Sequence, residues 1–357
     1  MADQKTDNAT FVTGHTRSGT NLLLRLLDGS DGLAVPPGEG KLHILRRGLN
    51  AGWHDDDTSK RYDASAVEVG QGSESYFDFI DMIAQSTHQS NGACSRSSII
   101  PVVNAVFEYH EKKTGRVSNR WCEKNHNLEF FVNRALLSFS SPKFIVMKRN
   151  PKAVWASWKA YCHNKSLALG PSQLKKNLAY LLEQELREHI SGLKRFNELE
   201  ELLDHYFVMP SLHNDALQHI FRSERRENSS TLSDVIDIAR IPRSNTDAGC
   251  FCWNYIFLYN RAKWAAARFP EVCVLIDFES VVDEPGKVLQ KVCSYLDVTP
   301  PKGDALPTEF DKPWRSNTSF DSRALSVDRG VKARWRDFLE KSEEQTIDCL
   351  CEAYLTG

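Results

Sequence analysis

Three short apolar runs, at residues 10–13, 143–147 and 272–276, contain no regular alternation of polar and apolar positions. Such runs are typical of parallel strands that are buried on both faces. Each run is followed by turn or cap residues and then by a helical pattern. Repeated strand–helix units of this kind predict a three-layer α/β fold, in which helices flank a central parallel sheet. Two shorter runs, at 32–35 and 120–122, are candidates to complete the sheet.

Two stretches interrupt this pattern and are predicted to be insertions with helical segments. Residues 51–118 place clusters of Gly, Ser and Asp around one or two predicted helices. Residues 165–250 carry helical patterns, in which Leu174, Leu178 and Leu182 recur every four residues on one face. We expect this face to pack against the core; an acceptor lid or a dimer surface is the alternative. The prediction is one domain over residues 1–357 whose insertions shape the acceptor site, and a homodimer stays open.

A glycine-bounded loop follows the first predicted strand directly. Residues 14–21 read Gly-His-Thr-Arg-Ser-Gly-Thr-Asn and lead into a leucine-rich run typical of a buried helix. Such a loop can point successive backbone N–H groups at an anion, and the helix N-terminus adds positive potential. Arg17 can place two donors on phosphate or sulfate oxygens. The candidate anion-binding residues of this loop are His15, Thr16, Arg17, Ser18, Gly19, Thr20 and Asn21.

The two glycines of this loop have the spacing of a P-loop, but one residue departs from that motif. Thr20 stands where a nucleoside triphosphatase carries the lysine that binds its β- and γ-phosphates. The positive charge lies inside the loop instead, at Arg17. The pattern therefore predicts a P-loop-type fold and argues against a nucleoside triphosphatase. A polar turn without a ligand is the alternative.

A second candidate anion site follows the second predicted strand. Arg149 ends that strand, and open α/β sheets bind ligands at the carboxyl ends of their strands. Asn150 and Pro151 are favoured residues for the cap and the first position of a helix. Ser157 lies on this predicted helix, so Arg149 and Ser157 can bind a second phosphate. A surface arginine and a serine that packs between helices are the alternative.

Together, these segments resemble two motifs of the PAPS-dependent sulfotransferases, which use 3′-phosphoadenosine 5′-phosphosulfate (PAPS). Residues 13–21 resemble the family's 5′-phosphosulfate loop, and residues 144–157 resemble its 3′-phosphate motif. Residues 274–285 and 328–335 are similar to two further segments, of which the second closes over the cofactor. The resemblance implies PAPS as the cofactor and PAP as its product. It also implies cofactor contacts for Arg149, Ser157, Arg329 and Gly330.

Two more segments are similar to the tyrosylprotein and bacterial carbohydrate branches of this superfamily. Glu39 lies in a Pro-Pro-Gly-Glu-Gly turn, where those branches place a catalytic glutamate. Lys124 matches a lysine that contacts the transferring sulfuryl group. His43, four residues beyond Glu39, is its rival as the general base. Arg17 completes the predicted catalytic set, and Phe278 stands where the family usually has a tyrosine.

These residues predict in-line transfer of a sulfuryl group to a hydroxyl or an amine, with a carboxylate as the base. Such a transfer depends on positioning and on stabilisation of charge on the leaving and equatorial oxygens. We expect no metal requirement, because a sulfuryl group carries less charge than a phosphoryl group. A P-loop kinase or NTPase is the alternative, with Asp277 ending a Walker B-like strand. A non-catalytic scaffold is a third hypothesis.

Composition limits the partners and the compartment. The net charge of −2 gives no bulk attraction to nucleic acid. No apolar run is long enough for a membrane span and the polar N-terminus has no secretory signal, so we expect a cytoplasmic protein. The nine cysteines lack zinc-knuckle spacing and are expected to be reduced thiols. These features favour a soluble carbohydrate or a small natural product as the acceptor.

Overall fold

The structure, a computed structural model, describes several separate stretches of the chain. The described residues are 5–37, 96–126, 128–132, 135–136, 139–164, 247–314, 327 and 329–355. The predicted bases Glu39 and His43 lie outside them, as do residues 51–95 and 165–246 of the predicted insertions. The chain divides into two compact units. The first comprises Met1–Gly14, Gly19–Met147 and Phe269–Arg329, and the second comprises His15–Ser18, Lys148–Arg268 and Gly330–Gly357.

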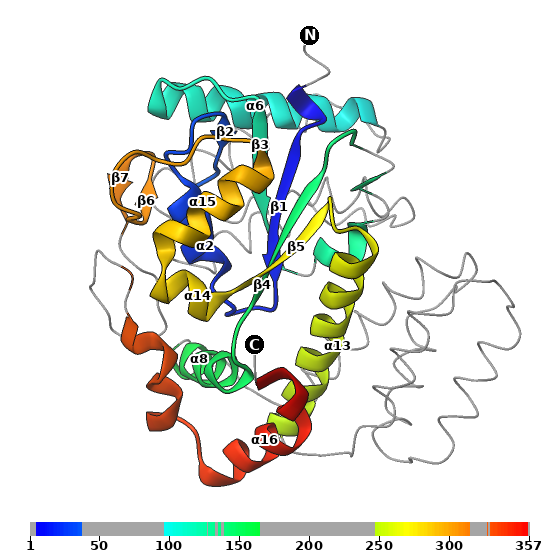
Figure 1. Ribbon diagram of the computed structural model, residues 1–357, viewed down its shortest axis with the longest axis vertical. Helices are drawn as coiled ribbons and strands as arrows, with labels where there is room; N and C mark the ends of the chain where they lie inside the picture. Colours follow the sequence, from blue (N-terminus) through cyan, green and yellow to red (C-terminus); the bar gives the residue numbers. More distant parts are fainter. Residues whose placement is uncertain are drawn as a thin grey trace, which may run out of the picture. The chain divides into compact units, whose positions relative to one another are not determined.

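A five-stranded sheet forms the centre of the first unit (Figure 1). Its strands lie in the order β2 (Leu33–Ala34), β3 (Arg120–Lys124), β1 (Ala9–Gly14), β4 (Lys143–Lys148) and β5 (Cys273–Asp277). The pairs β2–β3, β3–β1 and β1–β4 are parallel. All five predicted runs are strands of this one sheet, which confirms the prediction of an α/β fold with a central parallel sheet flanked by helices.

The register of the sheet aligns the carboxyl ends of its three central strands. Gly14, the last residue of β1, pairs with Met147 of β4, and Val12 pairs with Lys124, the last residue of β3. Open α/β sheets bind ligands at the carboxyl ends of their strands. Gly14, Lys124 and Met147 therefore lie at the edge of the sheet where a ligand site is expected.

Aromatic side chains fill the core around β1. Every residue of β1 and β3 is buried, as the lack of alternation predicted. The ring of Phe11 stacks on Phe144 with centroids 4.6 Å apart, and it meets the edge of Trp121 at 5.8 Å. Aromatic pairs of this kind stabilise a core beyond their buried area alone. They hold β1 between β3 and β4, and so fix the point where the next loop begins.

Helices α2 (Thr20–Leu27), α6 (Arg96–Thr114), α14 (Phe278–Asp283) and α15 (Pro285–Leu296) belong to the first unit. The buried leucines of α2 face β1 and β3, and α15 packs beside α2 (Figure 1). Helix α6 contacts β2 and β3 through buried residues such as Val103 and Val106. The later part of the predicted insertion 51–118 therefore contributes to the core of this unit.

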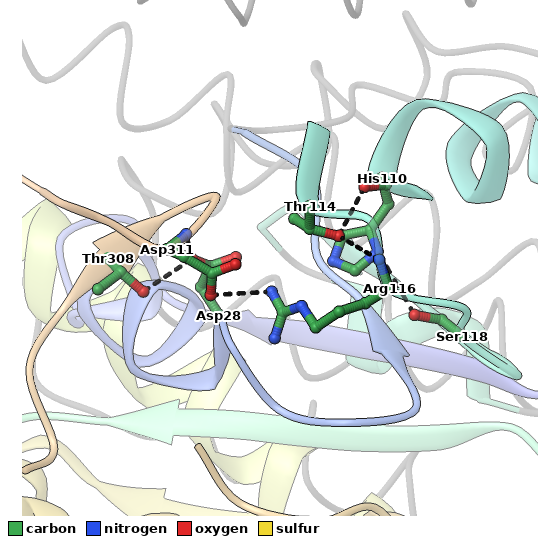
Figure 2. Close-up of polar contacts among 7 residues, drawn as sticks. All are labelled: Asp28, His110, Thr114, Arg116, Ser118, Thr308 and Asp311. Atoms are coloured by element: carbon green, nitrogen blue, oxygen red, sulfur yellow. Dashed lines mark hydrogen bonds and ion pairs between the residues drawn. The ribbon is translucent and has the colours of Figure 1, made fainter. Parts of the chain in front are cut away.

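Polar contacts fix a short hairpin to the end of α2 (Figure 2). The hairpin consists of β6 (Thr308–Glu309) and β7 (Lys312–Pro313). Asp28, the C-cap of α2, accepts a hydrogen bond from the Thr308 hydroxyl at 2.7 Å and one from the Asp311 N–H at 3.0 Å. Arg116 forms an ion pair with Asp311 at 3.1 Å. The end of α2 and the chain after α6 thus hold the hairpin from two sides.

His110 lies in the same polar region, near the end of α6, and only 2% of it is exposed (Figure 2). Its Nδ1 lies 3.4 Å from the hydroxyl of Ser118. Burial, with a further contribution from the nearby Arg116, lowers the pKa of His110 to about 4. The imidazole is therefore neutral at neutral pH, and acid must charge a buried group in order to protonate it.

The second unit contains α8 (Pro151–Asn164), α13 (Asp247–Arg268) and α16 (Lys341–Leu355), which pack against one another. The Oδ1 of Asn150 accepts a hydrogen bond from the Lys152 N–H at 2.9 Å, so the predicted cap of α8 is confirmed. The ring of Trp155 lies 5.1 Å from that of Phe251 on α13. Within the described ranges, no helix is both long and apolar enough to cross a membrane.

Ion pairs fasten α8 to α16. The Lys159 ammonium lies 2.7 Å from the Glu343 carboxylate, and the indole N–H of Trp155 donates to the same carboxylate at 3.0 Å. Lys152 pairs with Asp348 at 2.7 Å. Burial alone would raise the pKa of Glu343, but its hydrogen bonds from Lys159 and other donors outweigh burial and lower the pKa overall. The helix that carries Ser157 is therefore held along its length.

Candidate anion-binding site

The loop between β1 and α2 contains a tight turn with an arginine in an unusual conformation. The Ser18 N–H donates to the His15 carbonyl at 3.0 Å, which closes the turn. Arg17, the third residue of this turn, has a φ of 71°. For a residue other than glycine, the left-handed region costs roughly 1–2 kcal/mol. Surrounding contacts must hold Arg17 there, and such strain is common at ligand sites.

Arg149 supplies one of these contacts. Its Nη1 donates to the main-chain carbonyl of Arg17 at 2.9 Å, and its Nη2 lies 3.5 Å from the carbonyl of Val331. Arg149 directly follows β4 and is only 5% exposed. Within the second unit, its guanidinium thus connects the turn of the loop to the segment that begins at Gly330.

The side chain of Arg17 contacts the helix that follows Arg149. Its Nε donates to the Oγ of Ser157 at 3.2 Å, and its guanidinium lies over the ring of Tyr161 at 5.2 Å. The second unit therefore brings together Arg17, Arg149 and Ser157, which the sequence predicted as parts of two anion sites. Two guanidinium groups and a hydroxyl are donors that match the oxygens of phosphate or sulfate.

The positive field of Arg17 also reaches a buried thiol on α8. Burial raises the pKa of Cys162, while a hydrogen bond with Trp158 and the charge of Arg17 lower it in part. The net effect is a raised pKa, so Cys162 stays a neutral thiol near neutral pH. It packs in this region and is no candidate for a nucleophile.

Gly19 ends the loop as the N-cap of α2, with a φ of 95°. A Cβ at this position would lie 2.6 Å from Cε2 of Phe278 and closer still to Cδ2. Only glycine therefore fits between the loop and the phenyl ring. Thr20 and Asn21 form the first turn of α2, where backbone N–H groups have no partner inside the helix.

Ser18 gives a direct test of whether the loop fits an anionic cofactor. It is 1% exposed, and its Oγ has no hydrogen-bond partner among the described residues. Buried hydroxyl groups are almost always hydrogen bonded, and a bound anion is one partner that can satisfy such a group. Together with the donors of Arg17 and Arg149, the Ser18 hydroxyl fits a ligand that carries several acceptor oxygens.

Lys124 lies at the carboxyl end of β3 and is 1% exposed. The segment after it is tied to β1 by Thr13. The Thr13 hydroxyl donates to the Glu129 carboxylate at 2.7 Å and accepts the Leu128 N–H at 2.8 Å. These bonds hold the segment after Lys124 against the end of β1.

Arg25 of α2 holds the chain that leads toward Glu39. Its guanidinium, on a residue that is 4% exposed, donates to the carbonyls of Pro36 and Pro37 and pairs with Glu309 at 3.3 Å. Burial lowers the pKa of Arg25, and Glu309 and other acidic charge oppose that effect. Helix α2 is thereby connected to Pro37, the last described residue before Glu39.

The other predicted cofactor-binding residues differ in how far they are buried. His15 is 8% exposed and lies among aromatic rings, with Phe251 at 5.5 Å and Trp158 at 6.0 Å. Thr16 is half-buried in the turn. Gly330 is exposed in the 3₁₀ helix η2 (Arg329–Lys332), where Arg329 also lies. Tyr255 and Tyr161, which contact Arg149 and Arg17, belong to none of the motifs that the sequence analysis identified.

Comparisons with known proteins show which family the chain is similar to. A model of the sulfotransferase family matches residues 9–208. No curated protein matches the chain. One similar solved structure is a sulfotransferase domain from the curacin biosynthetic pathway, with 12% identity, 95% coverage of each chain and a TM-score of 0.43. Another is a sulfotransferase domain from the Synechococcus PCC 7002 olefin synthase, with 14% identity, 98% coverage of this chain, 95% of that chain and a TM-score of 0.42.

The family match covers more than half of the 357 residues. It contains the glycine-bounded loop, β3 with Lys124, β4, Arg149 and Ser157. The predicted resemblance is confirmed: the chain belongs to the sulfotransferase family and is a sulfotransferase enzyme.

Proposed function

We propose that this enzyme transfers the sulfuryl group of PAPS to a hydroxyl or an amine of a carbohydrate or a small natural product. The observation that carries the proposal is the cluster of Arg17, Arg149 and Ser157 in the second unit. Two guanidinium groups that are joined through the Arg17 carbonyl favour a ligand with more than one anionic group, because each has further N–H donors for a different group.

Residues of the chain fall into two proposed roles toward this cofactor. The loop from His15 to Asn21 would hold the 5′-phosphosulfate, with Ser18 donating from its buried hydroxyl. Arg149 and Ser157 would hold the 3′-phosphate, together with Arg329 and Gly330. The left-handed Arg17 supports this assignment, because strained residues are common where a loop is shaped for a ligand.

PAPS, when bound, supplies the sulfuryl group, whose bond to the 5′-phosphate oxygen breaks as the acceptor oxygen or nitrogen bonds to sulfur. Arg17 and Lys124 would stabilise negative charge on the sulfuryl oxygens and on the leaving phosphate oxygen. Fixed cationic donors of this kind act on charge that develops in the transition state. No metal takes part in this proposal.

A general base must take the proton from the acceptor. Glu39 is the proposed base, with His43 as its rival. The support from the described residues is indirect: Arg25 anchors Pro36 and Pro37 to α2, and Glu39 follows two residues after Pro37. General-base catalysis requires a carboxylate within reach of the acceptor proton, and Glu39 is proposed for this role.

The compartment and the assembly are part of the proposal. We propose the cytoplasm, because the cysteines of the described residues are free thiols, as is common in reducing compartments. A single catalytic domain over residues 1–357 is proposed, with the insertions at 51–118 and 165–250 shaping the acceptor site. A homodimer is compatible with this proposal.

The test compares PAP with ADP by calorimetry in the absence of magnesium. ADP carries the same adenosine but has its second phosphate at the 5′ end and none at the 3′ position. We expect PAP to bind at least roughly tenfold more tightly, since one charge-assisted contact is worth that much. Equal affinities, or binding of ADP that requires magnesium, would contradict the proposal and favour the kinase or NTPase alternative.

A further inference from the structure

Helix α13 lies outside the motifs that point to a sulfotransferase, yet it contacts the anion-binding cluster. Phe251, Tyr255 and Tyr259 follow one another at four-residue intervals and share one face of this helix. The rings of Phe251 and Tyr255 lie 5.9 Å apart, and those of Tyr255 and Tyr259 lie 6.2 Å apart. Only 3% of Tyr255, in the middle of the row, is exposed.

The hydroxyl of Tyr255 donates a hydrogen bond to the main-chain carbonyl of Arg149 at 2.6 Å. This distance is at the short end of the usual range for O–H···O bonds. Arg149 stands between the end of β4 and the start of α8, so its carbonyl lies beyond the sheet and before the first helical residue. A buried carbonyl at such a junction needs a donor, and Tyr255 supplies one.

The ring of Tyr255 contacts the other anion-binding segment. Its centroid lies 5.8 Å from the imidazole of His15, the first residue of the turn that contains Arg17. Phe251 meets the same imidazole edge-on at 5.5 Å. One side chain therefore touches both segments of the cluster within the second unit, the loop through its ring and Arg149 through its hydroxyl.

We propose that Tyr255 is a positioning residue for recognition of the 3′-phosphate. It fixes the main chain of Arg149, and the Arg149 guanidinium in turn holds the carbonyl of Arg17. The proposal rests on the proposed function, because it assumes that Arg149 binds the 3′-phosphate. Tyrosine suits this task because its ring is rigid and its hydroxyl gives one directed bond.

The experiment removes only the hydroxyl group. Tyr255→Phe keeps the ring against His15, and affinities for PAP and for AMP, which lacks the 3′-phosphate, are measured by calorimetry. We expect the Kd of PAP to rise roughly three- to tenfold, the effect of one neutral hydrogen bond, while the Kd of AMP changes less than about twofold. Tyr259→Phe removes a hydroxyl one turn further along the same helix face and serves as the matched control, with both Kd values unchanged.

A second variant separates positioning from a general effect on folding. In an Arg149→Ala background, Tyr255→Phe should not weaken PAP further, because its effect passes through Arg149. Equal losses for PAP and AMP, an unchanged PAP affinity, or losses that multiply in the double variant would each overturn the proposal. Failure of the proposed function gives a different result, because the wild-type protein would then show no preference for PAP over AMP.

Discussion

The Nε of Arg17 donates a hydrogen bond to the Oγ of Ser157 over 3.2 Å, although 140 residues separate them in the chain. The motifs assign Arg17 to the 5′ end of the cofactor and Ser157 to the 3′ end. Arg149 joins the same network through the Arg17 carbonyl. The residues assigned to the two ends of the cofactor are therefore joined by hydrogen bonds within the second unit.

The left-handed conformation of Arg17 predicts a difference between two substitutions. Arg17→Gly and Arg17→Ala both remove the guanidinium, but only glycine adopts a φ of 71° without strain. We expect the Gly variant to have a free energy of unfolding about 0.5–1 kcal/mol higher than the Ala variant in urea titrations. Both variants should lose affinity for PAP. An Ala variant that equals or exceeds the Gly variant in stability would contradict the strained conformation.

The close approach of Phe278 to Gly19 predicts that no side chain is tolerated there. Gly19→Ala should lower the free energy of unfolding by about 1–3 kcal/mol, because the new methyl group overlaps the phenyl ring at an unfavourable φ. Gly286→Ala is the control, since a Cβ at Gly286 meets nothing within 4 Å. Its effect should stay within about 0.5 kcal/mol. Similar effects at the two positions in thermal or urea unfolding would refute the steric account.

His110 predicts a loss of stability in mild acid. Its pKa is about 4 in the folded protein against 6.5 for an ordinary histidine. The unfolded chain therefore binds the His110 proton more tightly than the folded protein does. The neutral His110 contributes fully to the free energy of unfolding above about pH 6.5, and this contribution is lost as the pH falls toward 4. Between about pH 7.5 and pH 4, the wild-type protein should lose about 3 kcal/mol more than His110→Gln. Parallel pH profiles for the two proteins in urea titrations would show that His110 is not the responsible group.

Much of the fold could be predicted from local patterns. Buried strands of a parallel sheet lack alternation, and a cap such as Asn150 before Pro151 acts within a few residues. The place of Arg17 in a glycine-bounded loop between a strand and a helix could be predicted in the same way. Signals of this kind come from residues that lie close together in the chain.

The contacts that assemble the site could not be predicted, because they join distant residues. Tyr255 lies 106 residues from Arg149, and a tyrosine on a helix gives no sign of the carbonyl that it contacts. The positive φ of Arg17 could not be predicted either, because the residues that normally indicate a left-handed backbone conformation are glycine and asparagine. The sequence pattern predicted a phosphate-binding role for Arg149 but gave no sign that its guanidinium also contacts the loop.

The proposed base predicts a selective loss of turnover. Glu39→Gln keeps the shape of the side chain and removes its basicity, so kcat should fall roughly a hundredfold to ten-thousandfold with the Kd of PAP nearly unchanged. His43→Gln should cause a smaller loss. Steady-state rates with a working acceptor give kcat for each variant, and calorimetry gives the Kd of PAP. If His43→Gln abolishes turnover while Glu39→Gln keeps most of it, the roles of the two residues are reversed.

The affinity of Arg149→Ala for PAP tests the central claim most directly. Arg149→Ala removes a buried guanidinium that is proposed to bind the 3′-phosphate, and Arg268→Ala removes an exposed guanidinium in the same unit as a control. Calorimetry without magnesium should show PAP binding weakened roughly tenfold to a hundredfold by the first substitution and unchanged by the second. Arg149→Ala should also lower the midpoint temperature of thermal unfolding of the ligand-free protein, because the Arg17 carbonyl loses a hydrogen-bond donor. A PAP affinity that is the same in Arg149→Ala as in the wild-type protein would contradict the account.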